Sequence, residues 1–130
     1  MSKEDFKNYV VNDLLRNLPD ISVRSMFGGY GIYQGGDFFA VTVGGQLYFK
    51  VDDSNRGDYE AAGSHAWTYN DGKRMVTMGY WLLPENILED SQSVIEWVKK
   101  SVLVAQNKKK IKKVSNKTKY GTGKKTSKKS

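Results

Sequence analysis

Two glycine pairs divide the run from Met26 to Asp52 into three short segments, and this run constrains the fold more than any other stretch of the chain. Gly35-Gly36 and Gly44-Gly45 tolerate the positive φ angles that tight hairpin turns need. Between these pairs, aromatic and β-branched residues follow a period of two, which is typical of strands. The run therefore predicts an antiparallel three-stranded meander, approached by an extended segment over residues 23–27.

The same alternation predicts which side chains share a face of the sheet. In the second segment one face receives the odd-numbered residues Phe39, Val41 and Val43. In the third segment one face receives the odd-numbered residues Leu47, Phe49 and Val51. A half-buried strand presents such an alternation when only one of its faces packs on the core.

Helices are predicted before and after this meander in the sequence. Ser2 and Asp5 form the pattern of a capping box, and the apolar residues that follow at helical spacing predict a first helix, which Pro19 ends. A short helix is expected over residues 54–62. After Pro84, which starts a helical turn, Asp90 or Ser91 caps a last helix.

A second hairpin lies between these helices, with strands at 66–70 and 73–82 around the turn Asp71-Gly72. Together the segments predict an α+β fold. Its antiparallel sheet has about five strands in α-β(3)-α-β(2)-α order, with the helices largely on one face.

The charge is divided unevenly along the chain. Residues 1–107 hold 10 Lys and Arg against 14 Asp and Glu, whereas residues 108–130 hold 11 lysines and no acid. The second segment is also too poor in apolar side chains to offset its ordering entropy. We therefore predict one folded domain over 1–107 and a disordered lysine tail over 108–130, whose first turn or two extends the last helix.

A flexible run of lysines releases counterions from a phosphate backbone and so gives salt-dependent, sequence-independent affinity. The lysine tail thus predicts non-specific binding of nucleic acid, either DNA or RNA; a merely solubilising end is the alternative. The candidate binding residues are Lys108, Lys109, Lys110, Lys112, Lys113, Lys117, Lys119, Lys124, Lys125, Lys128 and Lys129.

Several classes of chemistry find no support in the sequence. The chain has no cysteine, which excludes disulfides and thiolate metal sites. His65 is the sole histidine and has no nucleophile context, and the paired carboxylates lack calcium-loop spacing. We predict no catalytic residue, cofactor or metal. The charged N-terminus and the lack of a long apolar run predict a cytoplasmic protein with no membrane contact.

The aromatic residues leave more than one interpretation open. Tyr33, Tyr48, Lys50 and Tyr80 are expected on a common open face. Such a face could stack nucleic-acid bases, line a protein-binding groove, or simply pack at the core and rim. The glycine run 28–31 matches no phosphate-binding spacing and is typical of a bulge or a close backbone approach.

Several motifs occur in the order expected for a known family. The stretches at 26–33, 47–52, 67–69, 78–81 and 83–85 resemble the N-terminal domain of the TfoX/Sxy family, the bacterial regulators of natural competence. The resemblance covers roughly residues 3–106 and implies the fold order given above and a non-enzymatic role. The motif positions, which look like fold determinants, are Met26, Phe27, Gly28, Gly29, Gly31, Tyr48, Lys50 and Trp97.

In that family the domain precedes a smaller helical domain, and the protein acts as a transcriptional co-activator with the cyclic-AMP receptor protein. Here the lysine tail follows instead, as in a stand-alone N-terminal domain. We therefore expect a regulatory adaptor whose folded domain binds a protein partner, by resemblance part of the transcription machinery. The alternative is a small-ligand-binding or enzymatic domain with a pocket beside the meander and His65. A monomer and a homodimer both stay open.

Overall fold

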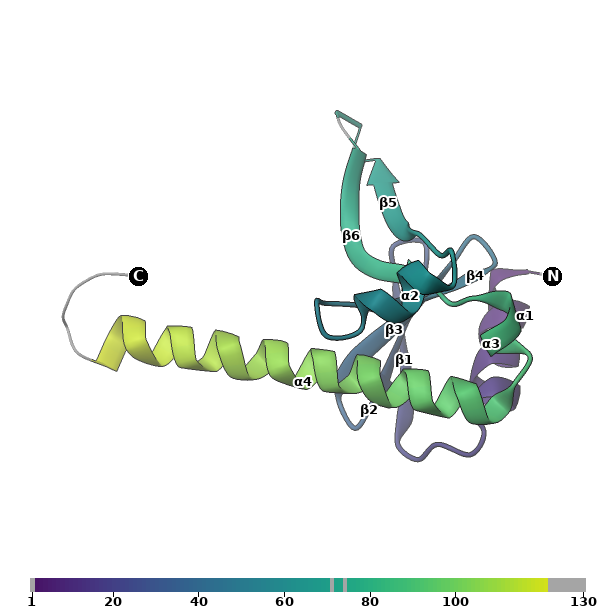
Figure 1. Cartoon of the computed structure of the whole chain (residues 1–130), viewed down its shortest axis with the longest axis horizontal. Helices are drawn as coiled ribbons and strands as arrows, with labels where there is room; N and C mark the ends of the chain where they lie inside the picture. The colour runs from purple at the N-terminus through teal and green to yellow at the C-terminus, as the bar shows by residue number, and fades with distance from the viewer. Residues whose placement is uncertain (1, 71, 74, 122–130) are drawn as a thin grey trace.

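The computed structural model describes residues 2–70, 72–73 and 75–121, and describes side chains for all of these except 69–70, 75–78 and 111–121. Six strands form one antiparallel sheet in the order β1-β2-β3-β4-β6-β5 (Figure 1). The strands are β1 (Ile21–Met26), β2 (Gly29–Gln34), β3 (Asp37–Val43), β4 (Gln46–Lys50), β5 (Ala66–Asn70) and β6 (Met75–Leu82). The helices are α1 (Lys3–Tyr9) with its π-helical continuation η1 (Val10–Leu14), α2 (Arg56–Ala61), α3 (Glu85–Leu88) and α4 (Ser91–Gly121).

The α+β class is as predicted, but the sheet has one strand more than expected. The segment predicted as an extended approach is β1, which pairs along its whole length with β2, so the meander has four strands. β1 was missed because it is an edge strand with no fully buried residue, and its exposed positions Ser22, Arg24 and Ser25 give a weak strand signal.

Three two-residue turns with positive φ at both positions connect the first four strands. Gly35-Gly36 has φ angles of 56° and 87°, and Gly44-Gly45 has 59° and 74°, as the glycine pairs predicted. Phe27-Gly28 forms the third turn with φ angles of 55° and 74°. A bulky side chain is strained in this region, so Phe27 is held there by its surroundings.

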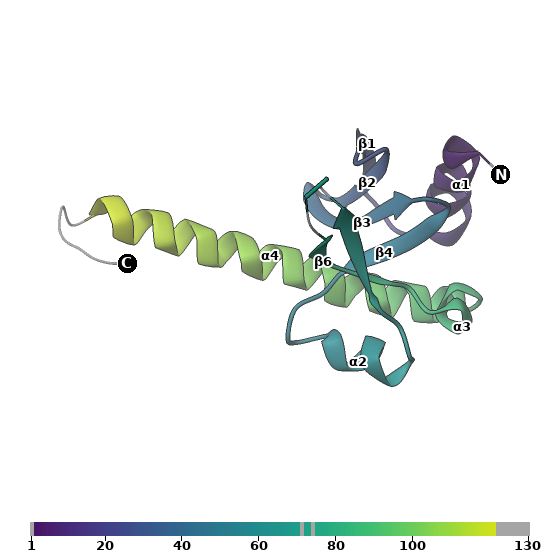
Figure 2. The same ribbon diagram turned by 90° about the horizontal axis from the view of Figure 1, so that it is seen from above.

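The helices cover one face of the sheet, which we call the helical face. Its core holds Phe39, Leu47, Phe49 and Val51 of the meander together with side chains from every helix. Figure 2 shows α4 running alongside β3 and β4. Leu47, Phe49 and Val51 share this face as predicted. α1 begins with the predicted capping box, in which Asp5 N donates to Ser2 Oγ at 3.1 Å.

A β-bulge overturns the face prediction for β3. Ile32 pairs with Ala40 and Tyr33 pairs with Phe38, which leaves Phe39 as an extra residue in the ladder. Phe39 and Ala40 therefore both lie on the helical face, whereas Val41 packs on the opposite one. The prediction that Phe39 shares a face with Val41 and Val43 was wrong, because one inserted residue reverses the alternation beyond it.

We call the other side of the sheet the aromatic face. Among the described side chains, its core is formed by strand residues: Val41, Tyr48, Trp67 and Tyr80, with Met26, Phe38, Val43 and Leu82 packed against them. Phe27, in the β1–β2 turn, lies edge-on to Trp67 of β5 with 5.3 Å between ring centroids. These two residues come from opposite ends of the strand order, so the sheet curls over this face.

The remaining elements differ from prediction mainly at their ends. α2 begins at Arg56, two residues later than expected, because Asp52 and Asn55 hold the chain in a polar turn. β5 has the predicted bounds, and Asp71 of the predicted turn lies outside the described residues. Within the described part of the chain, none of the helices combines the length and apolar character that a bilayer crossing requires.

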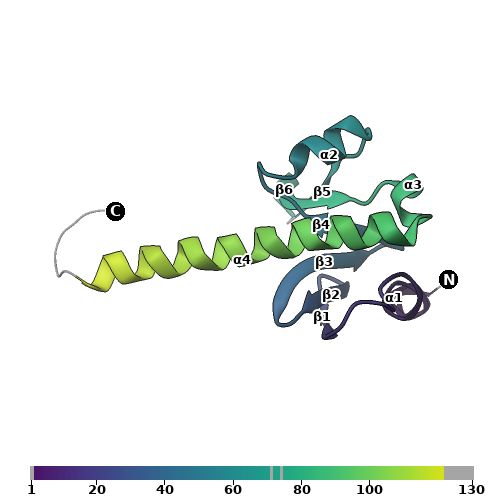
Figure 3. The same ribbon diagram turned by 60° about the horizontal axis from the view of Figure 1, so that its bottom comes forward.

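α4 is the longest element and runs across the sheet and out beyond it (Figures 1 and 3). Its backbone stays helical to Gly121, whereas composition predicted only one or two helical turns after residue 107. Helix extension needs no core of its own, since the packed first half supplies the nucleus and lysine is a good helix former. The domain boundary at residue 107 stays a prediction, and residues 122–130 lie outside the described residues.

Candidate nucleic-acid interface

The first half of α4 is fixed to the helical face by a stripe of small and apolar residues. Val94, Val98, Ser101 and Ala105 recur at spacings of four and three, and none is more than 3% exposed. At the start of the helix, Asp90 Oδ1 accepts from Gln92 N at 3.1 Å, the predicted cap. The hydrogen bonds that Asp90 accepts from Ser93 and from the helix backbone lower the pKa of its carboxyl group.

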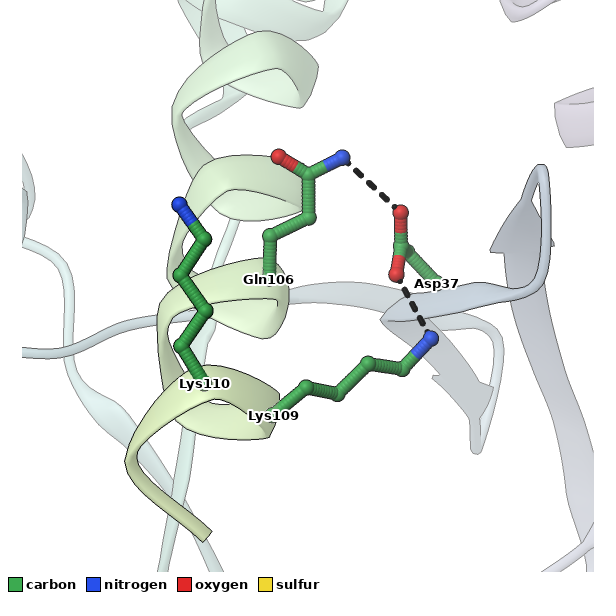
Figure 4. Close-up of a pocket in the computed structure, with 4 residues that line it drawn as sticks. All are labelled: Asp37, Gln106, Lys109 and Lys110. Carbon is green, nitrogen blue, oxygen red and sulfur yellow. Dashed lines mark hydrogen bonds and ion pairs between the residues drawn. The ribbon is translucent and has the colours of Figure 1, made fainter. Parts of the chain in front are cut away.

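Where α4 leaves the sheet, polar contacts replace this packing. Asp37 begins β3, and its carboxylate accepts hydrogen bonds from Gln106 Nε2 at 3.0 Å and from Lys109 Nζ at 2.8 Å (Figure 4). Lys109 also donates to the carbonyl oxygen of Gly36 at 3.3 Å. We call these contacts the Asp37 junction; they fix the direction in which the helix continues.

The electrostatics of the junction follow from its burial. Asp37 is only 8% exposed, and burial alone would raise the pKa of its carboxyl group. The hydrogen bonds from Lys109 and Gln106 outweigh that effect, so the pKa lies below its ordinary value. Asp37 is thus a carboxylate that holds one lysine of the tail against the folded domain.

Lys50, the last residue of β4, lies close to this junction on the aromatic face. Its Nζ is 5.1 Å from the ring centroid of Phe38 and 5.6 Å from that of Tyr80. Burial is the main cause that lowers the pKa of Lys50; repulsion by Lys108 and Lys109 adds to it, and Asp37 opposes it.

The structure distributes the predicted tail lysines over three zones. Lys108, Lys109 and Lys110 lie on α4 beside the sheet and are exposed. Four more follow on the helical backbone beyond the sheet, where side chains are not described: Lys112, Lys113, Lys117 and Lys119. The last four lie outside the described residues: Lys124, Lys125, Lys128 and Lys129.

The expected aromatic surface exists only in part. Tyr33 stacks on Phe38 with 5.0 Å between centroids, and Tyr48, Lys50 and Tyr80 lie on the same face. Tyr48 and Tyr80 are buried, however, at 7% and 9% exposure. Burial raises the pKa of the Tyr48 hydroxyl, which donates to Gln46 Oε1 at 2.9 Å. Their rings are therefore packed together and are not presented for base stacking.

Glycines of the family motif lie at close approaches. A Cβ atom on Gly31 would lie 2.6 Å from Cε of Met26 and 3.0 Å from the ring of Phe38, and one on Gly29 would collide with the backbone of Thr42. This agrees with the close approach that the glycine run 28–31 predicted. Elsewhere, Trp97 lies edge-on to Tyr59 with 4.6 Å between centroids. These positions all contribute to packing inside the fold.

Among the described residues, a hollow of about 380 Å³ lies at the Asp37 junction, lined by Asp37, Gln106, Lys109 and Lys110. His65 is not among the residues that line it. His65 is exposed, and its backbone oxygen accepts from Leu82 N. No group of three or more metal-ligating side chains occurs in residues 2–70, 72–73 and 75–121.

Sequence reasoning missed the Asp37 junction altogether. Asp37 directly follows the turn pair Gly35-Gly36, and its partners Gln106 and Lys109 lie 69 and 72 positions later in the chain. The one usable signal was a carboxylate placed at the start of a strand, which burial makes costly unless a partner is present.

Comparison with known proteins identifies the family. A family model described as the TfoX N-terminal domain matches residues 13–105, which is more than half of the chain. No curated protein matches the sequence. The family is generally regulatory, and the match supports a role like that of a competence regulator. The match includes Asp37 and ends just before Gln106, so Gln106 and Lys109, the partners of Asp37, lie outside it. The chain belongs to the TfoX N-terminal domain family.

Proposed function

We propose that this protein is a non-enzymatic regulatory adaptor, in which the folded domain binds a protein of the transcription machinery and the lysine tail binds nucleic acid. Family membership supports the regulatory role. The observation that carries the nucleic-acid half is the course of α4, which leaves the sheet and continues over residues 108–121 with seven lysines and no acid (Figure 3).

The physical basis is counterion release. A helix of 14 residues is about 21 Å long, so residues 108–121 can follow several phosphates of a duplex. Each neutralised phosphate makes log K fall with log salt by a slope of about 0.9. The acidic folded domain, with 14 Asp and Glu against 10 Lys and Arg, contributes little to such affinity as a whole.

Two weak contacts on one chain then reinforce each other. The tail keeps the domain near DNA or RNA, and the domain's own partner is met at a raised effective concentration. The small-ligand or enzymatic alternative ranks lower, because His65 does not line the hollow at the Asp37 junction.

The test is binding of a fluorescent 20-base-pair duplex by the full chain from low to physiological salt. In the variant, glutamine replaces the lysines beyond Lys110: Lys112, Lys113, Lys117, Lys119, Lys124, Lys125, Lys128 and Lys129. We expect the full chain to bind with a steep salt slope and the glutamine variant to lose most of that slope, since glutamine keeps the helix propensity and removes the charge.

The matched control replaces the same eight lysines with arginine, which preserves every charge and should preserve the slope. A full chain whose binding is absent or insensitive to salt contradicts the nucleic-acid half of the proposal. So does a glutamine variant that binds as well as the arginine control.

A further inference from the structure

We propose that Lys50 and Lys108 together form a phosphate-binding site on the folded domain, at the point where α4 leaves the sheet. The ligand is one phosphodiester group of a nucleic-acid backbone. This inference rests on the proposed function and deepens it, because it makes the sheet as well as the lysine tail a contact surface.

The position of Lys50 is fixed by both its backbone and its side chain. Its carbonyl oxygen accepts from Ser101 Oγ of α4 at 2.9 Å and from Asn55 Nδ2 at 3.1 Å. Its ammonium group lies against Phe38 and Tyr80 and is only half-buried. A side chain held in this way loses little further conformational entropy when an anion binds.

The position of Lys108 follows from the periodicity of α4. The buried stripe on α4 passes through Ser101 and Ala105, and its next position is residue 108. Lys108 therefore stands on the side of the helix that faces the sheet, but beyond the point where side chains are buried. Ser101 touches the backbone of Lys50, so the same side of the helix carries Lys108 past the end of β4.

The charges at this place are not balanced. Lys50, Lys108, Lys109 and Lys110 face one carboxylate, Asp37, which leaves a net charge of +3. Asp37 is already paired with Lys109. Among the described side chains, Lys50, Lys108 and Lys110 have no ion-pair partner.

Lys50 and Lys108 repel each other, which is one cause of the lowered pKa of Lys50. An anion between them removes this repulsion and adds two charge-assisted hydrogen bonds. A phosphodiester fits better than a carboxylate because α4 continues from the site through residues 111–119, four of which are lysines. Successive phosphates along a strand can then be met by successive lysines.

The test uses the full chain with Lys50→Gln, Lys108→Gln and both together. The matched control is the double variant Lys3→Gln and Lys99→Gln, which removes the same charge from exposed positions elsewhere. For the Lys50 and Lys108 double variant we expect the loss of one phosphate contact: a fall of about eightfold in affinity at 0.1 M salt and of about 0.9 in the salt slope.

Each single substitution should already give most of this loss, because the two ammonium groups hold the same phosphate and their effects do not multiply. The affinities for duplex DNA and duplex RNA of the same sequence are compared, to determine which backbone the site binds. Losses no larger than those of the Lys3 and Lys99 control overturn the inference. So does an effect seen only on binding of polyglutamate, which would make the site one for an acidic protein.

A second measurement does not depend on the fold of a variant. In the unmodified protein, acetylation of Lys50 and Lys108 by a soluble reagent should slow on addition of nucleic acid, while that of Lys99 should not. If nucleic acid slows the acetylation of all three lysines by the same factor, or of none, the site is contradicted. If the unmodified chain does not bind nucleic acid at all, the proposed function fails; if it binds but the Lys50 and Lys108 variants match their control, only this site fails.

Discussion

The two faces of the sheet are covered in different ways. Helices cover the helical face, where Phe39 and Phe49 are wholly inaccessible to solvent. On the aromatic face the described core residues all come from strands, and the sheet curls over them, with Phe27 still 48% exposed. The first face thus holds fully buried rings, and the second keeps Phe27 and Lys50 partly exposed, with Lys108 and Lys109 of α4 near enough to repel Lys50.

Substitutions at two neighbouring residues of β4, one on each face, compare the stability of the two faces most directly. Phe49→Ala leaves a cavity among fixed helices and strands, and we expect a loss of about 3–5 kcal/mol in the free energy of unfolding. Tyr48→Ala removes a ring from the aromatic face, which is closed only by strands and can relax, and should cost about 2 kcal/mol. Urea unfolding followed by circular dichroism gives both values. Equal losses would show that the aromatic face is as rigid as the helical one.

The packing of the aromatic face can be tested at Gly31. In Gly31→Ala the new methyl group meets the end of Met26 and the ring of Phe38, so we expect a loss of about 1–3 kcal/mol. Shortening the flexible neighbour in the double variant Gly31→Ala with Met26→Ala should cost less than the two single losses added together. Thermal and urea unfolding of the four proteins complete the cycle.

Gly29→Ala is the contrasting case, because the added methyl group collides with the backbone of Thr42 and no side chain can yield. Met26→Ala should not rescue it. Rescue of both glycine variants, or of neither, would mean that Met26 does not limit the space above Gly31.

The comparison also shows where sequence reasoning succeeds. Alternation correctly placed Leu47, Phe49 and Val51 together, and the glycine pairs correctly predicted two turns, because both signals are local. The same alternation gave a wrong result in β3, because the residue types do not show that the bulge at Phe39 inserts one position. β1 was predicted only as an extended segment leading into the meander, because serine and arginine are weak strand formers.

The candidate site was predictable only in its charge. The composition identified the lysines. The change of composition after Asn107 marks the end of the acidic residues, but it does not show where the contact between α4 and the sheet ends. Lys109 contacts Asp37, and Lys108 stands on the sheet-facing side of α4, so these two lysines differ from the rest of the run. Contacts between residues about 70 positions apart depend on the finished topology, which no local pattern contains.

The Asp37 junction, at the rim between the two faces, gives the smallest effect. In Asp37→Asn the ion pair with Lys109 is lost while an amide oxygen can still accept from Gln106. Lys109 is 62% exposed, so solvent screens the pair, and we expect a loss of only about 0.5–1 kcal/mol at neutral pH. Asp58→Asn, which breaks the pair between Lys100 of α4 and α2, is the matched control.

The dependence on pH separates the charge of Asp37 from its shape. The pKa of Asp37 in the folded protein lies below the ordinary value of 3.8, so the folded state binds its proton less readily than the unfolded chain does. The contribution of the carboxylate is therefore complete above pH 3.8 and is lost as the pH falls through the lower folded value. Asparagine cannot titrate, so the difference between wild type and Asp37→Asn should shrink over that acidic range in urea unfolding curves. A difference that stays constant there would mean that Asp37 stabilises the junction through its shape and hydrogen bonds, and that its charge does not hold Lys109 in place.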